Sequence, residues 1–152
     1  MFKALANLWV AILCGVGLIF VGLVAIYISL PDVTILRKCI VTEMYHVRLC
    51  ENDSTFVPFD KISPYIVGAV IMSEDASFYF HAGVDVDEMK ESFIKDAEKM
   101  RFARGASTIT QQLAKNVFLS GEKSPVRKIQ EILIAVQLER YFTKKQLSAR
   151  CL

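Results

Sequence analysis

The chain has 152 residues, of which 53% are hydrophobic and 22% are charged, and its formal net charge at pH 7 is +2. A chain of this length has room for one membrane segment and one modest domain, since a soluble domain takes ~100–200 residues. The small net charge gives no support for nucleic-acid binding or for bulk attraction of an acidic substrate, so any anion must be bound by individually placed residues.

The first predicted element is a transmembrane helix. No residue between Lys3 and Asp32 is charged, and residues 5–30 are almost entirely apolar. A helix of that length crosses the ~30 Å hydrocarbon core of a bilayer. A cleaved signal peptide has a shorter apolar region of ~7–15 residues, so the pattern favours a retained anchor over residues 1–31. Basic residues flank both ends of the run and leave its orientation undecided.

Residues 32–61 are predicted to form a juxtamembrane connector. β-branched residues such as Thr34-Ile35 favour a short strand or an extended segment, and the polar residues that follow favour a loop. The connector contains Cys39 and Cys50, which could form a disulfide in an oxidising compartment, although their spacing alone does not show that they meet. With His46 they match no zinc-binding spacing, which disfavours a metal site.

From residue 62 onward the start and stop signals predict a mainly helical domain. Ser63-Pro64 and Ser124-Pro125 each place a capping residue before a proline at the first helical position, and Ser107 is a third candidate cap. Apolar residues then recur at helical spacing. The predicted helices cover residues 64–75, 87–100, 108–119 and 125–141, with another turn beginning at Thr143.

Three short segments carry the functional information. The patterns E-D-x-x-F-x-x-H-x-G, G-x-S-T-I-T-Q-Q-x-x-K-N and R-K-x-x-E are filled at residues 74–83, 105–116 and 127–131. In this order and spacing they resemble the first three motifs of the peptidoglycan glycosyltransferases. The resemblance runs over residues 62–146 and implies a lysozyme-like glycosyltransferase domain. Because the family continues with further motifs that this sequence lacks, we expect residues 62–152 to be a partial, truncated or frame-shifted domain.

The resemblance also implies a reaction and a location. Family members join lipid II disaccharide-peptide units into glycan strands, with inversion at the anomeric carbon and release of polyprenyl pyrophosphate. The implied partners are lipid II, the growing lipid-linked glycan chain, the membrane and other cell-wall synthesis proteins, with no nucleic acid. The implied location is the bacterial inner membrane, with a single span and the catalytic part on the periplasmic side.

The first motif places two carboxylates side by side, Glu74 and Asp75. Neighbouring residues of a helix point about 100° apart, so only one of them can face a reacting atom. We expect Glu74 to be the general base on the acceptor 4-hydroxyl, surrounded by the aromatic residues 78–80, as in an inverting glycosidase with a sugar hydroxyl in place of water. Asp75 is expected to accept hydrogen bonds from backbone or from His81, whose own role is structural.

The leaving pyrophosphate needs neutralising charge, so cations and helix N–H groups are expected around it. Gln111 and Lys115 lie four residues apart and are expected to share one helix face. Glu131 is the second predicted catalytic residue, by resemblance to the motif glutamate near the leaving group, although an ordinary ion pair with Arg127 is the alternative. The predicted substrate-binding residues are Ser107, Thr108, Gln111, Gln112, Lys115, Lys123, Arg127 and Arg104.

No cofactor is expected to be obligatory, but Mg²⁺ could bridge Glu131 and the pyrophosphate. Two other functions compete with glycosyl transfer. A lysozyme-like lytic hydrolase could also use one glutamate, but it would need neither a membrane anchor nor a cationic site. A catalytically impaired, membrane-tethered binding or assembly component would fit the absent motifs, whereas the intact Glu74 argues against it.

Overall fold

The computed structural model describes residues 2–50, 57–99, 107–122 and 124–151. The chain divides into two compact units, Met1–Leu30 and Pro31–Leu152. The first unit contains helix α1 (Phe2–Ile28), close to the predicted span. An 18-residue window of the apolar run has a mean hydropathy of 2.7, and in the described part of the chain this is the one helix long and apolar enough to cross a membrane. A helix that is apolar all round, with Leu18 and Phe20 exposed, is suited to a lipid environment.

The second unit begins with the 3₁₀ helix η1 (Val33–Arg37), which packs against helix α5 (Pro125–Tyr141). The expectation of an extended segment at Thr34-Ile35 is wrong. The Asp32 carboxylate accepts hydrogen bonds from the backbone N–H and hydroxyl of Thr34, which caps a helical turn instead.

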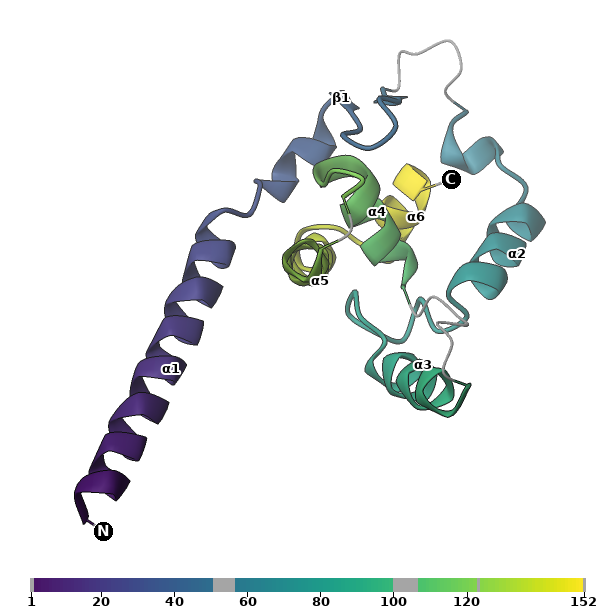
Figure 1. The fold of residues 1–152 in the computed structure, drawn as a ribbon. Coiled ribbons are helices and arrows are strands. Elements are labelled where there is room, and N and C mark those ends of the chain that lie inside the picture. Colours follow the sequence, from purple (N-terminus) through teal and green to yellow (C-terminus); the bar gives the residue numbers. More distant parts are fainter. Residues whose placement is uncertain (1, 51–56, 100–106, 123, 152) are drawn as a thin grey trace. The chain divides into compact units, whose positions relative to one another are not determined.

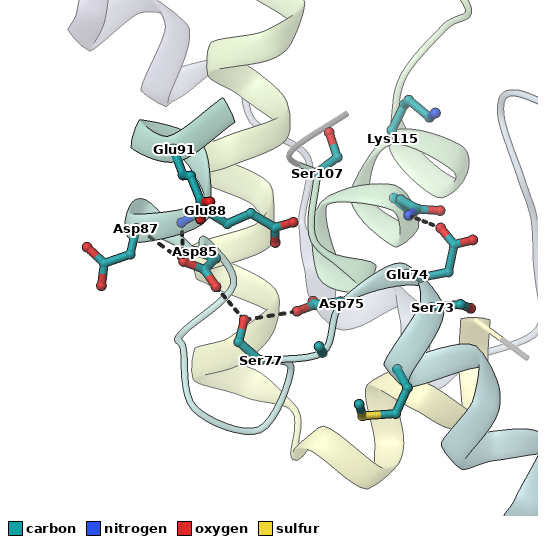
Figure 2. Close-up of a pocket in the computed structure, with 13 residues that line it drawn as sticks. Ser73, Glu74, Asp75, Ser77, Asp85, Asp87, Glu88, Glu91, Ser107 and Lys115 are labelled. Carbon is teal, nitrogen blue, oxygen red and sulfur yellow. Dashed lines mark hydrogen bonds between the residues drawn. The ribbon is translucent and has the colours of Figure 1, made fainter. Parts of the chain in front are cut away.

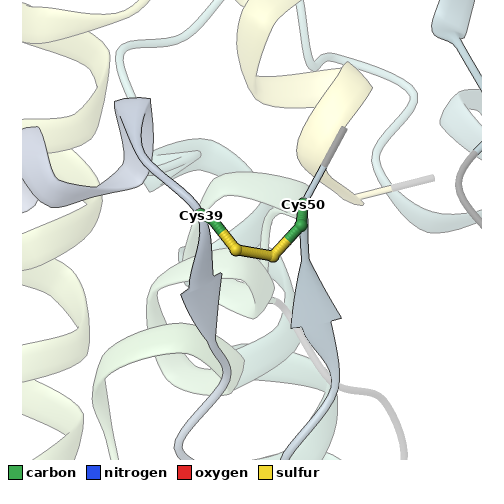
Figure 3. Close-up of a disulfide and its surroundings, with 2 residues drawn as sticks. All are labelled: Cys39 and Cys50. Carbon is green, nitrogen blue, oxygen red and sulfur yellow. A yellow bond between two sulfur atoms is a disulfide. The ribbon is translucent and has the colours of Figure 1, made fainter. Parts of the chain in front are cut away.

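A small hairpin follows, with strand β1 (Ile40–Val41) antiparallel to strand β2 (Arg48–Leu49). Cys39 and Cys50, the residues just outside the two strands, are joined by a disulfide (Figure 3). In the hairpin loop the N–H groups of Glu43 and Met44 donate to the carbonyl oxygens of Val117 and Asn116, at 3.2 and 3.1 Å. The loop therefore satisfies carbonyls at the end of helix α4 (Ile109–Phe118), and the predicted connector is part of the packed unit.

The remaining elements are helical, as the sequence predicts (Figure 1). After the 3₁₀ helix η2 (Phe59–Lys61) come α2 (Pro64–Glu74), α3 (Val86–Lys99), α4, α5 and α6 (Lys144–Cys151), each within two residues of its predicted start. α4 packs on α5 and α6. The core at this junction is formed by buried apolar residues: Phe78, Leu113, Ala114, Val117, Ile134, Ala135, Leu138 and Leu147.

Helix α2 differs from its expected burial. Its apolar stripe predicts one buried face, but Ile71 is buried while Ile66 is exposed, as are Tyr65 and Met72. Among the described residues, no element packs against α2 extensively. The position of α2 is instead determined at its C-terminal end, where the first motif begins.

We predict that the Cys39–Cys50 disulfide stabilises the second unit by about 3 kcal/mol, the loop-closure value for a loop of this size. The sequence separation of the two cysteines is 11. Thermal unfolding in detergent, followed by circular dichroism, should shift to a lower temperature when a dithiol is added. The double variant Cys39→Ala/Cys50→Ala should unfold at the same temperature as the reduced protein, and adding the dithiol should not change that temperature. Replacing Cys14 and Cys151 by serine should preserve the dithiol response, and an unchanged melt on reduction would contradict the assignment.

Candidate active site

The end of α2 is fastened to the start of α4 by one buried carboxylate. Asp75 is 2% exposed, and its Oδ2 accepts a hydrogen bond of 3.0 Å from the backbone N–H of Ile109. Both of its oxygens lie 3.0 Å from His81 Nε2, and the Ser77 hydroxyl donates to Oδ1 at 3.3 Å. The structural roles predicted for Asp75 and His81 are therefore confirmed.

The first motif ends in a glycine, Gly83, that lies directly against α5. Gly83 has φ of +90°, and a Cβ at this position would lie 2.8 Å from the carbonyl oxygen of Ala135. Any other residue would be strained twice, by the left-handed backbone and by the contact. The carbonyl of Gly83 accepts a 2.7 Å hydrogen bond from the Thr108 hydroxyl, which ties this turn to the start of α4.

Helix α4 begins with a capping box formed by Thr108 and Gln111. The Thr108 hydroxyl accepts from the N–H of Gln111 at 3.1 Å, and Gln111 Oε1 accepts from the N–H of Thr108 at 3.0 Å. Ser107 is therefore not the cap, because its neighbour takes that role. The helix N-terminus is also not a free anion site, since Ile109 and Gln111 already donate to Asp75 and Thr108.

Because of this cap, some residues of the second motif are buried and others line a cavity. Thr108 and Gln111, both predicted to bind substrate, are buried with their side chains in the cap. Gln111 therefore does not share a solvent-facing side with Lys115. Two other residues of α4, Gln112 and Lys115, line a cavity that also contains the end of α2.

That cavity has a volume of about 700 Å³ and lies between the end of α2, the start of α3 and the exposed face of α4 (Figure 2). It brings together Glu74, Ser107, Gln112 and Lys115 from the predicted site. The described residues that line it are Met72, Ser73, Glu74, Asp75, Ala76, Ser77, Asp85, Asp87, Glu88, Glu91, Ser107, Gln112 and Lys115.

Glu74, the last residue of α2, is exposed to this cavity, and its Oε2 accepts a 3.0 Å hydrogen bond from Gln112 Nε2. The aromatic residues expected around it, residues 78–80, are not among the described residues that line the cavity. Phe78 is buried in the core, and Tyr79 and Phe80 line a different, mainly apolar cavity of about 730 Å³. The three aromatic residues follow Glu74 in sequence, but the turn directs them away from its carboxylate.

Glu131 lies outside the lining of the 700 Å³ cavity. Its side chain is 3% exposed and is paired with two cations, Arg127 at 2.9 Å and Lys128. The Lys128 ammonium also donates to the Ser107 hydroxyl at 3.0 Å, so it connects the buried carboxylate to a residue of the cavity wall. Lys128 is the lysine of the third motif, but it was not among the predicted substrate-binding residues.

The predicted Mg²⁺ site does not fit this arrangement. Both carboxylate oxygens of Glu131 are occupied, one by Arg127 and the other by Lys128. Mg²⁺ demands a nearly ideal octahedron of oxygen ligands. Within the described residues, no group of three or more His, Cys, Asp or Glu side chains could hold a metal ion. Two further candidates, Arg104 and Lys123, lie outside the residues that the structure describes.

Sequence reasoning missed the acidic wall of the cavity, which comes from the start of α3. Asp85 caps this helix by accepting from the N–H groups of Asp87 and Glu88, at 3.0 and 2.9 Å, and the Ser77 hydroxyl also donates to it. The backbone hydrogen bond from Glu88 is the largest of the causes that lower the pKa of Asp85. Acidic residues in a first helical turn are a recognisable N-terminal signal, so a capping role for Asp85 could have been predicted.

The sequence is similar to those of known proteins. The sequence model of the Transglycosylase family matches residues 41–149, which include every described residue of the cavity wall. The "Biosynthetic peptidoglycan transglycosylase" of Nitrosospira multiformis is 45% identical over 92 residues, and that of Chromobacterium violaceum is 49% identical over 92 residues. Each alignment covers 60% of this chain and 40% of the relative.

A longer alignment joins the chain to "Penicillin-binding protein 1A" of Aquifex aeolicus, at 36% identity over 149 residues. It covers 92% of this chain and 20% of the relative. The chain thus spans well under two thirds of the length of the relatives that it matches.

We predict that Asp75→Ala destabilises the second unit by about 2 to 4 kcal/mol, because it leaves the buried N–H of Ile109 and the His81 ring without their partner. Chemical or thermal unfolding would measure the loss. Asp87→Ala is the matched control: its side chain is 96% exposed on the same cavity, so the change should stay within about 0.5 kcal/mol. Equal stabilities for the two variants would show that Asp75 does not hold the site together.

Proposed function

Because the chain belongs to the transglycosylase family, we propose that it takes part in polymerising glycan strands of peptidoglycan from lipid II, with release of polyprenyl pyrophosphate. The observation that carries this proposal is the pairing of groups around one cavity. A carboxylate at a helix end, Glu74, and the ammonium group of Lys115 line the same space of about 700 Å³, and Lys128 reaches the wall through its hydrogen bond to Ser107. Inverting transfer to a sugar hydroxyl needs a base on one side and charge neutralisation on the other.

In this mechanism Glu74 removes the proton from the acceptor 4-hydroxyl as its oxygen attacks the anomeric carbon of the donor. The bond from that carbon to the polyprenyl pyrophosphate breaks, and the pyrophosphate leaves as an anion. Attack from the opposite face inverts the configuration. The exposure of Glu74 suits this role, because its carboxylate is accessible from the cavity whereas that of Asp75 is buried.

The leaving group would be bound by Lys115, Ser107 and Lys128. Ser107 and Lys115 line the cavity, and the Lys128 ammonium lies 3.0 Å from the Ser107 hydroxyl with its side chain 39% exposed. A pyrophosphate is a stable anion, so these positive charges contribute more than a proton donor would.

In this proposal Glu131 acts through its two cations rather than by touching the reacting atoms. A buried carboxylate between Arg127 and Lys128 holds both side chains in place and lowers the cost of bringing two positive charges together. Glu131, predicted to be the second catalytic residue, is thus proposed to be a positioning residue. The proposed mechanism contains no step on a metal ion.

We further infer that α1 is a retained anchor and that the second unit faces the periplasm, beside the membrane that carries lipid II. The disulfide supports this orientation, because disulfides persist in oxidising compartments such as the bacterial periplasm and are rare in the cytosol. Growing glycan chains and other cell-wall synthesis proteins would then be accessible to the protein.

The proposal predicts that Glu74→Gln lowers the rate of lipid II polymerisation by at least ~100-fold, because a glutamine cannot take the proton. Binding of lipid II should change little. Polymer is measured by electrophoresis of labelled glycan, with Glu122→Gln, an exposed glutamate between α4 and α5, as the control that keeps full activity. Wild-type polymer from Glu74→Gln would remove this residue from the mechanism, and shortening of added glycan strands by the unmodified protein would support the lytic alternative.

The orientation predicts the behaviour of fusions. An alkaline phosphatase reporter joined after Leu152 should be active, because that enzyme needs periplasmic oxidation, and a cytoplasmic fluorescent reporter at the same position should be dark. The amino terminus should stay intact, so that the protein remains in the membrane fraction after an alkaline wash. A mature terminus near Pro31 would show that α1 is a cleaved signal instead.

A further inference from the structure

We propose that the Cys39–Cys50 disulfide is a redox switch for the site, opened by a protein dithiol that attacks Cys39, and that it acts through the last turn of α4. This inference rests on the proposed function, since it concerns a cation that binds the leaving pyrophosphate. That cation, Lys115, lies in the last turn of α4. The hairpin loop that the disulfide closes is hydrogen-bonded to the same turn (Figure 3).

The C-terminal end of α4 depends on this loop. The last carbonyl groups of a helix have no hydrogen-bond partner within it, and Asn116 and Val117 carry two of them. The N–H of Met44 donates to the carbonyl of Asn116 at 3.1 Å, and the N–H of Glu43 donates to that of Val117 at 3.2 Å. Because α4 has 10 residues, too few for a stable isolated helix, its last turn should fray when these donors are withdrawn.

The loop in turn depends on the disulfide. Strands β1 and β2 have two residues each, and a hairpin of this size is at best marginally stable in water. Within the loop, the N–H of Thr42 donates to the carbonyl of Val47 at 2.8 Å, and the hydroxyl of Thr42 accepts from the N–H of Val47 at 2.9 Å. Few hydrogen bonds therefore remain to hold the loop against α4 when the disulfide is broken.

Reduction would disturb one side of the cavity and preserve the other. Glu74 is followed by Asp75, which is bonded to the first turn of α4, and that turn keeps its capping box. Lys115 at the opposite end of the helix would lose its fixed backbone. A cation stabilises a leaving anion well only when it is already in position, so glycosyl transfer should slow without loss of the fold.

The two sulfur atoms differ in accessibility. Cys50 is 6% exposed, whereas Cys39 is an exposed residue beside the exposed Lys38, whose positive charge attracts a thiolate. Thiol–disulfide exchange begins when a thiolate attacks an accessible sulfur. Attack at Cys39 breaks the S–S bond, and Cys50 leaves as a thiolate and takes up a proton. The second thiol of the donor then displaces Cys39, so the donor becomes a disulfide and both cysteines become thiols.

The first test compares the two ends of α4 by amide hydrogen exchange. It uses the whole ¹⁵N-labelled chain in detergent, with Cys14→Ser and Cys151→Ser so that dithiothreitol acts on the hairpin alone. At labelling times too short for the buried amides of α5 to exchange, reduction should speed exchange of residues 116–119 by at least about tenfold and leave residues 111–114 within about twofold. No change, or an equal change at both ends, would overturn the switch.

The second test compares the two redox states in lipid II polymerisation. Reduction should lower kcat by about tenfold, and reoxidation should restore it. In Lys115→Ala, reduction should change the residual rate less than about twofold, because the side chain through which the loop acts is gone. Lys90→Ala on α3, whose side chain is 68% exposed, is the matched control and should keep the tenfold response.

A tenfold loss on reduction in Lys115→Ala would overturn the path through the last turn of α4, and an unchanged kcat in the parent protein would overturn the switch. If the chain polymerises no lipid II in either redox state, the proposed function fails. The exchange measurement then decides by itself whether the loop controls α4.

The site of attack is tested by trapping. A thioredoxin variant that keeps only its attacking cysteine cannot resolve the mixed disulfide, so the linked protein accumulates. Mass spectrometry of its peptides should find the thioredoxin on Cys39. A link to Cys50, or no link at all, would overturn the assignment of Cys39 as the sulfur that is attacked.

Discussion

The site depends on the contact between Asp75 and the first turn of α4. One buried carboxylate joins the end of α2, the turn that contains His81 and the backbone of Ile109. Because a buried charge is costly unless it is hydrogen-bonded, this group of partners is held together or lost as a unit. Glu74 and Gln112 each lie within three residues of that contact, so their relative position is set by the interior of the protein and not by the surface that they share.

A second buried carboxylate organises the cations. Glu131 occupies the space between Arg127 and Lys128, and Lys128 reaches Ser107 on the cavity wall. The two buried carboxylates therefore have different roles. Asp75 joins the helices that position the general base, and Glu131 positions the positively charged side chains. In both cases the residue that touches substrate in the proposed mechanism is a neighbour of the buried one.

Much of this arrangement follows from the sequence. The helices, the membrane-spanning candidate, the family and the roles of Asp75 and His81 were predicted from periodicity, capping signals and three motifs. The errors arose where two neighbouring residues could play the same part. Thr108 rather than Ser107 caps α4, because only Thr108 also reaches the carbonyl of Gly83, a residue distant in sequence.

The identity of the capping residue determines which side chains of α4 are buried, and the sequence alone could not show this. With Thr108 as the cap, Gln111 turns into the interior and Gln112 faces the cavity. The aromatic residues after Glu74 were misplaced for a similar reason, since the direction of a turn depends on long-range contacts such as that of Gly83 with Ala135. The acidic residues at the start of α3 were not predicted to line the cavity, because acidic residues on a helix usually face solvent.

The hairpin closed by Cys39 and Cys50 has a consequence for biogenesis. Its loop completes the C-terminal end of α4, yet the covalent bond that secures the loop forms only where thiols are oxidised. With the second unit exported, as we propose, the chain leaves the ribosome and crosses the membrane without this fastening. Maturation of the site helix would then be coupled to arrival in the compartment where the substrate is consumed, and overproduction in a reducing cytosol would yield a looser protein.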